Sequence, residues 1–324
     1  MDKSLKNIYL MITGLLVAMT AQVNGAEFSS QSSCCEKSCC DSQQDLLFFK
    51  AELLYWRPEL CGLESAFGDT TISTSVNNGF VTTTINESDK KPHNKWNTGF
   101  RIGAEYDFDC FEIEVDWTHF DGHSKFNKSG QHGHWNIDYD VVDLTFGRDF
   151  WVGSCFYIKP FIGIRGARIH QKLISHLETL FTSTLIGNNI VTSFKHNTEK
   201  FSGVGPQIGV EADWAIGCNF RIYSAFDVVT YYGNVKNKSL ETDTFTTTIS
   251  ISNGRAKRCF NSIGTDFTLG IRWDKSWTCS CYEMDLMLKL GLEQHRIYDF
   301  SNLGSDGTLS LDGGVFGAGI GFHY

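Results

Sequence analysis

The sequence has little proline, and after its first 25 residues it has no long apolar run. Only 4 of the 324 residues are proline, which is largely excluded from sheet interiors because it cannot donate a ladder hydrogen bond. No later segment approaches 18 consecutive apolar residues, so helical membrane spans are excluded. The sequence also has no basic tract, and 28 bases against 37 acids give a net charge of −9. Nucleic acid is therefore not an expected partner.

The N-terminus resembles an export signal. Lys3 and Lys6 precede an apolar run from Ile8 to Met19, and small residues near Gly25 offer a cleavage site. We predict a signal peptide over residues 1–25, although a retained anchor is the alternative. A polar, cysteine-rich periplasmic arm is predicted over residues 26–45, followed by a barrel over residues 46–324.

Residues 96–120 alternate strictly between apolar and polar side chains. One face carries Phe100, Ile102, Ala104, Tyr106 and Phe108, followed after an Asp-Cys turn by Phe111, Ile113, Val115 and Trp117. The opposite face carries Arg101, Glu105, Glu112, Glu114 and Asp116. Alternation over about ten residues is typical of transmembrane β-strands. We expect the apolar face to contact lipid and the charged face to line a barrel interior.

The rest of the chain repeats this pattern with alternating short and long connections. Beside the hairpin of residues 96–120, the predicted strands cover residues 46–57, 137–150, 156–164, 204–214, 219–232, 263–273, 282–292 and 314–324. Residues 121–135, 169–200 and 233–261 are expected to be polar loops, with a hairpin tip at Gly187-Asn188-Asn189. Residues 58–95 are expected to form a surface hairpin or an inserted plug. The prediction is an all-β antiparallel up-and-down barrel of about ten strands, with up to 16 if loop hairpins also span.

Three local irregularities are also expected. The apolar positions of residues 137–150 change from odd to even, which predicts a bulge at Val141-Val142. Pro160 and Pro206 lie inside predicted strands, where proline favours bulges over regular pairing.

The predicted inward positions carry more acids than bases. The acids are Glu52, Glu105, Asp107, Glu112, Glu114, Asp116, Asp143, Glu211, Asp213, Asp227, Asp266, Glu283, Asp285 and Glu293. The bases are Lys50, Arg101, Lys159, Arg165, Arg221, Arg272 and Lys289. Because pairing cannot be complete, water should enter, and acidic rings select cations. A narrow barrel filled with ion-paired side chains is the alternative.

Several stretches together resemble one family. They are WNTGFRIGAEYDF, FEIEVDWTHF, DLTFGRDFWVGSCFYIKPFIGIRGARI, FSGVGPQIGVEADW and GLEQH. They resemble the Legionella-type pore-forming outer-membrane proteins, which include the major-outer-membrane-protein-like porins of chlamydia-related bacteria. The resemblance covers nearly all of the predicted mature chain. It implies a pore-forming barrel in the bacterial outer membrane, surrounded by lipid, and it supplies no catalytic motif, cofactor or solute.

The 11 cysteines concentrate at the predicted periplasmic side. Cys34, Cys35, Cys39 and Cys40 lie in the arm, and the predicted short turns carry Cys110, Cys155, Cys218, Cys279 and Cys281. Only Cys61 and Cys259 fall on the outer side. Because separate turns are too far apart for many internal pairs, we predict intermolecular disulfides to sister copies or cysteine-rich envelope proteins. Pairing between arm and turns, or a zinc site in the arm, are the alternatives. A homo-oligomer such as a trimer is possible, but no residue signature in the sequence determines the oligomeric state.

Two further functions are open on the outer side. Histidines and an acid follow the third predicted strand at His119, Asp121, His123, His132 and His134. They could activate water or hold a metal, but no HExxH or GxSxG motif is present. We therefore expect no enzyme. Long Thr/Ser/Asn-rich loops could instead bind host molecules, as an adhesin does.

Overall fold

The described part of the chain is a single closed β-sheet with one separate hairpin. The computed structural model describes residues 46–61, 69–77, 80–88, 93–108, 110–128, 131–153, 155–183, 187–217, 219–245, 248–279, 282–301, 303 and 307–323. Twelve strands form one sheet, and two of these have only two residues. Ten long strands therefore make the wall, as the sequence predicts. Among the residues described, there is no helix long and apolar enough to cross a membrane.

The strands of the wall differ greatly in length. Their bounds are β1 Leu46–Leu60, β5 Asn97–Phe108, β6 Phe111–Lys128, β7 Gln131–Arg148, β9 Phe156–Ser183, β10 Gly187–Gly217, β11 Phe220–Phe245, β12 Thr248–Cys279, β13 Tyr282–Ile297 and β14 Leu309–His323. The two-residue strands are β4 His93–Asn94 and β8 Phe150–Trp151. The hairpin of β2 Asp69–Asn77 and β3 Phe80–Ser88 pairs as a second sheet.

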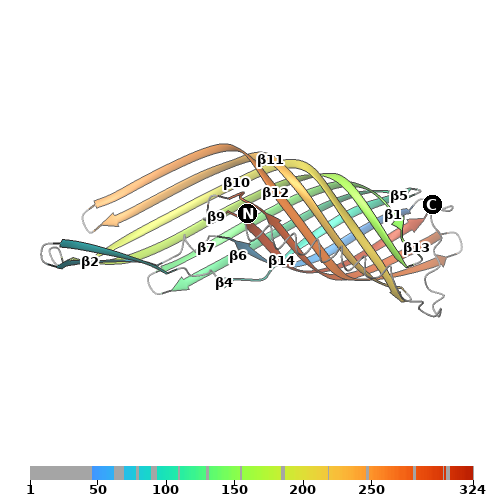
Figure 1. Ribbon diagram of the computed structural model, residues 1–324, viewed down its shortest axis with the longest axis horizontal. Helices are drawn as coiled ribbons and strands as arrows, with labels where there is room; N and C mark the ends of the chain where they lie inside the picture. Colours follow the sequence, from blue (N-terminus) through green and yellow to red (C-terminus); the bar gives the residue numbers. More distant parts are fainter. Residues whose placement is uncertain are drawn as a thin grey trace. The chain divides into compact units, whose positions relative to one another are not determined.

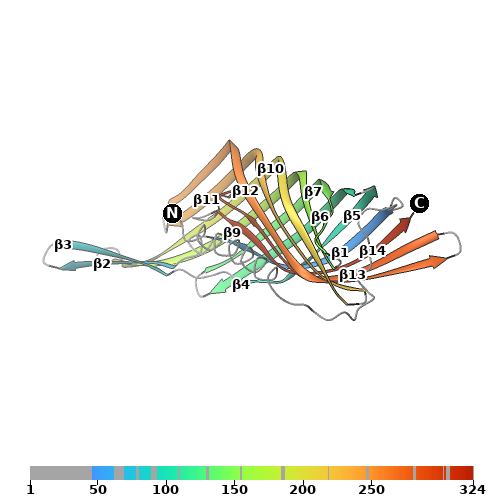
Figure 2. The same ribbon diagram turned by 45° about the vertical axis from the view of Figure 1, so that its right-hand side comes forward.

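The sheet closes through antiparallel pairs between neighbouring strands. Strand β1 pairs with β14 from Leu46 opposite His323 to Leu60 opposite Leu309, and β9 pairs with both β7 and β10. Figures 1 and 2 show these strands side by side in the order of their pairing. One end of the barrel carries the short turns, which is the periplasmic end of bacterial barrels. The opposite end carries the long hairpins.

The outward face of the wall is apolar along a continuous belt. Phe49, Leu53 and Tyr55 of β1 are 46%, 56% and 50% exposed, as the alternation predicts. The outward positions of the other strands repeat the pattern, including Ile102, Trp117, Leu144, Ile162, Ile208, Ile271, Leu290 and Phe316. An exposed apolar surface of this extent requires lipid around it. The fold therefore matches a barrel that spans a membrane.

The expected polar loops are wrong, because these residues continue the strands. Strands β6 and β7 stay paired as far as Lys128 opposite Gln131. Strands β9 and β10 stay paired as far as Ser183 opposite Gly187, which places Gly187-Asn188-Asn189 inside β10 rather than at a tip. Strands β11 and β12 likewise pair as far as Phe245 opposite Thr248. Polar residues on both faces hide a strand from the alternation test, although backbone pairing between long antiparallel strands holds it.

The bulge expected at Val141-Val142 is also wrong. Val141 pairs with Thr118 and Ala167, and Val142 pairs with Trp117 and Gly166, in one unbroken register. Odd positions of β7 face inward along its whole length and even positions face outward. The apparent change of phase arises because the inward face is apolar only in its outer half.

The two prolines also sit in strands that keep their register. Pro160 pairs with Val210 of β10 and Pro206 pairs with Ile164 of β9, with no shift in the pairing described for β9 and β10. On the opposite edge of its strand, each proline stands at a position without a residue pair. The β7 pairing ends at Phe161, next to Pro160, and the β10–β11 pairs skip from Val204 to Gln207. A gap needs no donor, so the missing N–H of proline costs no ladder bond there.

Some predictions concern residues outside the described ranges. These are the signal peptide, the periplasmic arm with its four cysteines, Cys218, Cys281 and the terminal Tyr324. The segment from 58 to 95 does contain a hairpin, formed by β2 and β3.

Candidate functional site in the barrel interior

All twenty-one acids and bases predicted to face inward lie on inward-facing positions of their strands. The periodicity of a strand is sufficient to place them there. They do not form one site. Most join ion-pair clusters in the periplasmic half of the barrel, here called the polar layer, and each cluster links several strands.

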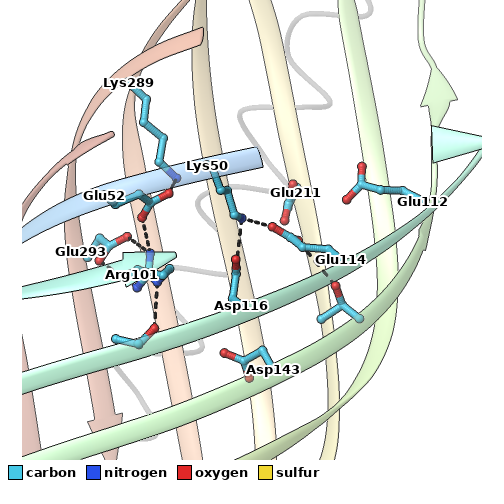
Figure 3. A network of polar contacts seen from close by, with 12 residues as sticks. Lys50, Glu52, Arg101, Glu112, Glu114, Asp116, Asp143, Glu211, Lys289 and Glu293 are labelled. Carbon is cyan, nitrogen blue, oxygen red and sulfur yellow. Dashed lines mark hydrogen bonds and ion pairs between the residues drawn. The ribbon is translucent and has the colours of Figure 1, made fainter. Parts of the chain in front are cut away.

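The first cluster is centred on Arg101 of β5. Its Nη1 lies 2.7 Å from Oε2 of Glu52 on β1 and 2.9 Å from Oε1 of Glu293 on β13. Lys289 of β13 forms an ion pair with the other oxygen of Glu52. Figure 3 shows these side chains converging from separate strands. Because β5 and β13 are separated by β14 and β1, this cluster ties together non-adjacent parts of the wall.

Two lysines form ion pairs with further acids of the polar layer. Lys50 forms ion pairs with Glu114 and, at 3.0 Å, with Oδ2 of Asp116 (Figure 3). Lys159 of β9 contacts Glu112 of β6 at 2.6 Å and Glu211 of β10 at 2.9 Å.

Another cluster surrounds Arg165 of β9. Its guanidinium forms ion pairs with Asp143 of β7 and Asp266 of β12, and it lies 3.5 Å from Asp227 of β11. His295 continues the network, with Nδ1 at 3.0 Å from Asp266. A buried arginine with three carboxylates has good geometry for pairing, which offsets the cost of taking the charges out of water.

Near the periplasmic end the clusters are looser. Arg272 lies 3.3 Å from Asp213 and 3.0 Å from Asp274, and Arg221 lies 3.2 Å from Asp274. Both arginines keep about a quarter of their side-chain surface exposed.

The outer half of the interior is mainly apolar, a feature that the alternation in the sequence does not reveal, although Gln171 and Glu199 are buried there as well. Its side chains, here called the apolar layer, come from most of the wall strands and are buried: Leu54, Trp56, Leu60, Phe120, Trp135, Ile137, Tyr139, Val141, Ala167, Ile169, Leu173, Phe201, Val229, Tyr231, Val235, Ile297, Phe300, Leu309, Leu311 and Val315. The ring of Trp56 lies 5.4 Å from that of Phe120 and 4.6 Å from that of His295. His295 therefore marks the boundary between the two layers. The apolar layer fills the interior on the outer side of the charged clusters.

The polar layer has more acid than its bases can neutralise. The inward positions named above carry fourteen acids and seven bases. One carboxylate oxygen of each of Asp107, Asp116 and Asp213 is buried without a hydrogen-bond partner in the described part of the chain. Such oxygens need water or a cation.

One acidic group has metal-ligand spacing. Carboxylate oxygens of Glu105, Asp107 and Glu112 all lie within 4.8 Å of one another. Carboxylates are the ligands that hard cations prefer. Since Lys159 already pairs with Glu112, this group has a partial counter-charge.

The outward histidines and acids lie on β6 and β7 beyond the apolar belt. Asp121, Gly122, His123, Lys125, His134, Asn136 and Asp138 line a groove of about 500 Å³. His119 contacts Asp140 at 2.7 Å and Asp121 at 3.6 Å. Burial lowers the pKa of His134, and burial together with the Asp121 carboxylate raises the pKa of Asp138. The groove brings together three of the five residues singled out in the sequence, namely Asp121, His123 and His134.

The cysteines follow the predicted two-sided distribution where they are described. Cys110 and Cys155, in adjacent short turns, are both disulfide-bonded within the chain, so the predicted intermolecular bonds do not apply to these two cysteines. On the outer side, Cys61 is half-buried and Cys259 is exposed on β12.

Comparison with known proteins identifies the family. The model for the family described as Legionella pneumophila major outer membrane protein precursor matches residues 38–306. The chain belongs to this family. Its location in the outer membrane follows from the family and from the lipid-facing belt. No curated protein matches the chain.

Solved barrels are similar only at low identity. The outer-membrane protease OmpT of Escherichia coli is 10% identical, over 89% of this chain and 99% of OmpT, with a TM-score of 0.36. A FadL homologue of Pseudomonas aeruginosa is 6% identical, over 88% and 91%, with a TM-score of 0.33. Ail, the attachment invasion locus protein of Yersinia pestis, is 9% identical, over 87% and 100%, with a TM-score of 0.26.

Proposed function

We propose that this member of the Legionella major outer membrane protein family is a narrow, cation-preferring pore for small hydrophilic solutes. The observation that carries the proposal is the two-to-one excess of acids over bases on the inward face of the polar layer. A purely structural filling would favour balanced charges, because unpaired buried carboxylates are costly. The excess favours a hydrated space with mobile cations.

The apolar layer sets the barrier in this pore. Water and ions leave a narrow apolar constriction readily, so such a segment gates by dewetting. Trp56 and Phe120, which pack on each other, are among its largest fully buried side chains. We therefore expect small or infrequent conductance steps in the native protein.

The test is single-channel recording on the refolded chain in planar bilayers. Replacing Trp56 and Phe120 by alanine should raise the conductance or the open time while keeping the preference for cations. Phe100→Ala, which removes an aromatic side chain from the outward face, is the matched control and should not change the conductance. Silence from the native chain and the double variant, each shown to be folded by its heat-dependent electrophoretic mobility, would contradict the pore.

A structural or adhesive role is the second candidate. It is favoured by the long pairs of β6–β7, β9–β10 and β11–β12, which continue beyond the apolar belt. Such strands would present a surface to host molecules. Shortening the β11–β12 hairpin should remove binding to host cells and leave conductance and folding intact. We propose no enzymatic activity for the outward groove.

The periplasmic cysteines suggest cross-linking as part of the same role. With Cys110 and Cys155 disulfide-bonded, the remaining periplasmic cysteines are the candidates for bonds to sister copies or cysteine-rich envelope proteins. An oxidising periplasm permits these bonds.

A further inference from the structure

Basic side chains gather on the outward face of β9–β12, immediately beyond the apolar belt. The belt ends on β10 and β11 at Val204 and Tyr232, which pair with each other and are 53% and 55% exposed. The next three outward positions of the four strands hold seven bases, here called the basic band: Arg168, Lys172, Lys200, Lys236, Lys238, Arg255 and Lys257. All but Lys172 are exposed.

The register places like charges directly opposite one another. Lys200 pairs with Lys236, and Lys236 pairs with Lys257, so three lysines stand in a row across three strands. Lys238 pairs with Arg255 two residues further out. Like charges at directly opposed positions destabilise a sheet. The arrangement therefore calls for an anionic partner.

The outward positions of this region supply no such partner. From Arg168 to Lys172 and at the positions paired with them on β10–β12, all described, the other side chains are uncharged except His170. On the adjacent strand β7, Asp138 contacts His170 at 3.1 Å, and Asp140 stands opposite Arg168 and contacts His119 at 2.7 Å. Neither acid is paired with a lysine of the row. The anion that compensates the row of Lys200, Lys236 and Lys257 must then come from outside the chain.

The height of the band identifies the class of that anion. Lys236 is four residues beyond Tyr232, which is about 13 Å along a strand and about 10 Å along the membrane normal at the usual barrel tilt. This is the level of lipid headgroups, and the band faces sideways along the membrane rather than away from it. Neighbouring strands are about 4.8 Å apart, so adjacent lysines can share one phosphate, and arginine can bind phosphate with two N–H groups.

We infer that the basic band binds the phosphate groups of lipid headgroups in the outer leaflet. The ligand is a phosphorylated lipid held against the barrel wall, with its acyl chains on the apolar belt below and its phosphates between the lysines. This role is independent of the proposed pore. It would fix the barrel in a phosphate-rich leaflet and neutralise the lysine row.

The test is a titration of the refolded full chain, in uncharged detergent micelles, with bisphosphorylated lipid A. The Lys200→Gln, Lys236→Gln, Lys257→Gln variant should bind at least about tenfold more weakly, since each base near an anionic surface contributes a several-fold factor. A variant with Lys95→Gln, Lys125→Gln and Arg148→Gln removes the same charge from exposed positions elsewhere and should bind as the native chain does.

Further variants and ligands in the same titration distinguish lipid phosphate from other anions. A triple Lys→Arg variant at the three band positions should keep the affinity, and dephosphorylated lipid should bind far more weakly to the native chain. Equal binding of the native chain to phosphorylated and dephosphorylated lipid would overturn the inference, even where the glutamine variant failed to fold. So would a folded glutamine variant with native affinity, or strong binding of soluble heparin with none of lipid A.

Discussion

Replacing Arg101 by methionine is the sharpest test of the ion-pair network. The change removes the cation between Glu52 and Glu293, whose side chains are 0% and 1% exposed. Removing one partner of a buried pair typically costs about 3–5 kcal/mol, because a buried charge is left uncompensated. Glu52 keeps Lys289 and Glu293 keeps His295 at 3.3 Å. We therefore expect a loss near the lower end, about 3 kcal/mol of unfolding free energy.

The assay is urea unfolding in lipid vesicles, followed by tryptophan fluorescence. Arg221→Met is the matched control, because its ion pair with Asp274 is 24% and 31% exposed and should contribute less than about 1 kcal/mol. Adding Glu293→Gln to Arg101→Met should recover part of the loss by removing an uncompensated carboxylate. An Arg101→Met loss no larger than that of Arg221→Met would refute the argument that these pairs are buried and structural.

Three further predictions concern other parts of the barrel. A Cβ at Gly205 would lie 1.7 Å from the carbonyl oxygen of Thr230, so Gly205→Ala should reduce the yield of folded barrel. Gly166→Ala is the control, because the nearest atom to its Cβ would be 4.0 Å away, and it should fold with the native yield. Equal yields of the two variants would contradict the close contact of β10 with β11 at Gly205. Neutralising Glu105 and Asp107 together should shift the reversal potential in a salt gradient towards zero, and an unchanged potential would exclude them from the ion path. Non-reducing electrophoresis of native envelopes should show high-mass species that a reductant dissolves, and monomers alone would contradict cross-linking.

The wall of the barrel could be predicted from the sequence because one face of each strand is uniformly apolar. Phe100, Ile102 and Val115 alternate with polar residues or glycine within the belt, and strict period two fixes both the strand and its orientation. The lumen-facing acids and bases follow from the same parity. The ten strands and their outward faces can therefore be predicted from the local sequence pattern.

The interior of the outer half could not be predicted in the same way. Tyr139 and Val141 face inward and Val142 faces outward, so β7 is apolar on both sides near its middle. Alternation alone cannot separate an inward apolar layer from a bulge. The extended hairpins are hidden for the opposite reason, since residues such as Lys125 and His134 are polar on a face that contacts water.

The partners of the ion pairs also cannot be predicted from the local sequence pattern. Arg101 and Glu293 are 192 residues apart in sequence and meet only because closure brings β13 near β5. The alternation predicts that each faces inward, but it carries no information on height or rotamer. The basic band has the same origin, since Lys200, Lys236 and Lys257 form a row only through the register of three strands.

The most direct test of the pore is the reversal potential of single channels formed by the native chain under a salt gradient. The acid excess of the polar layer predicts discrete steps with a potential biased towards cations, larger or more frequent once Trp56 and Phe120 are alanine. An anion-biased or zero potential, or no steps from either folded protein, would contradict the account.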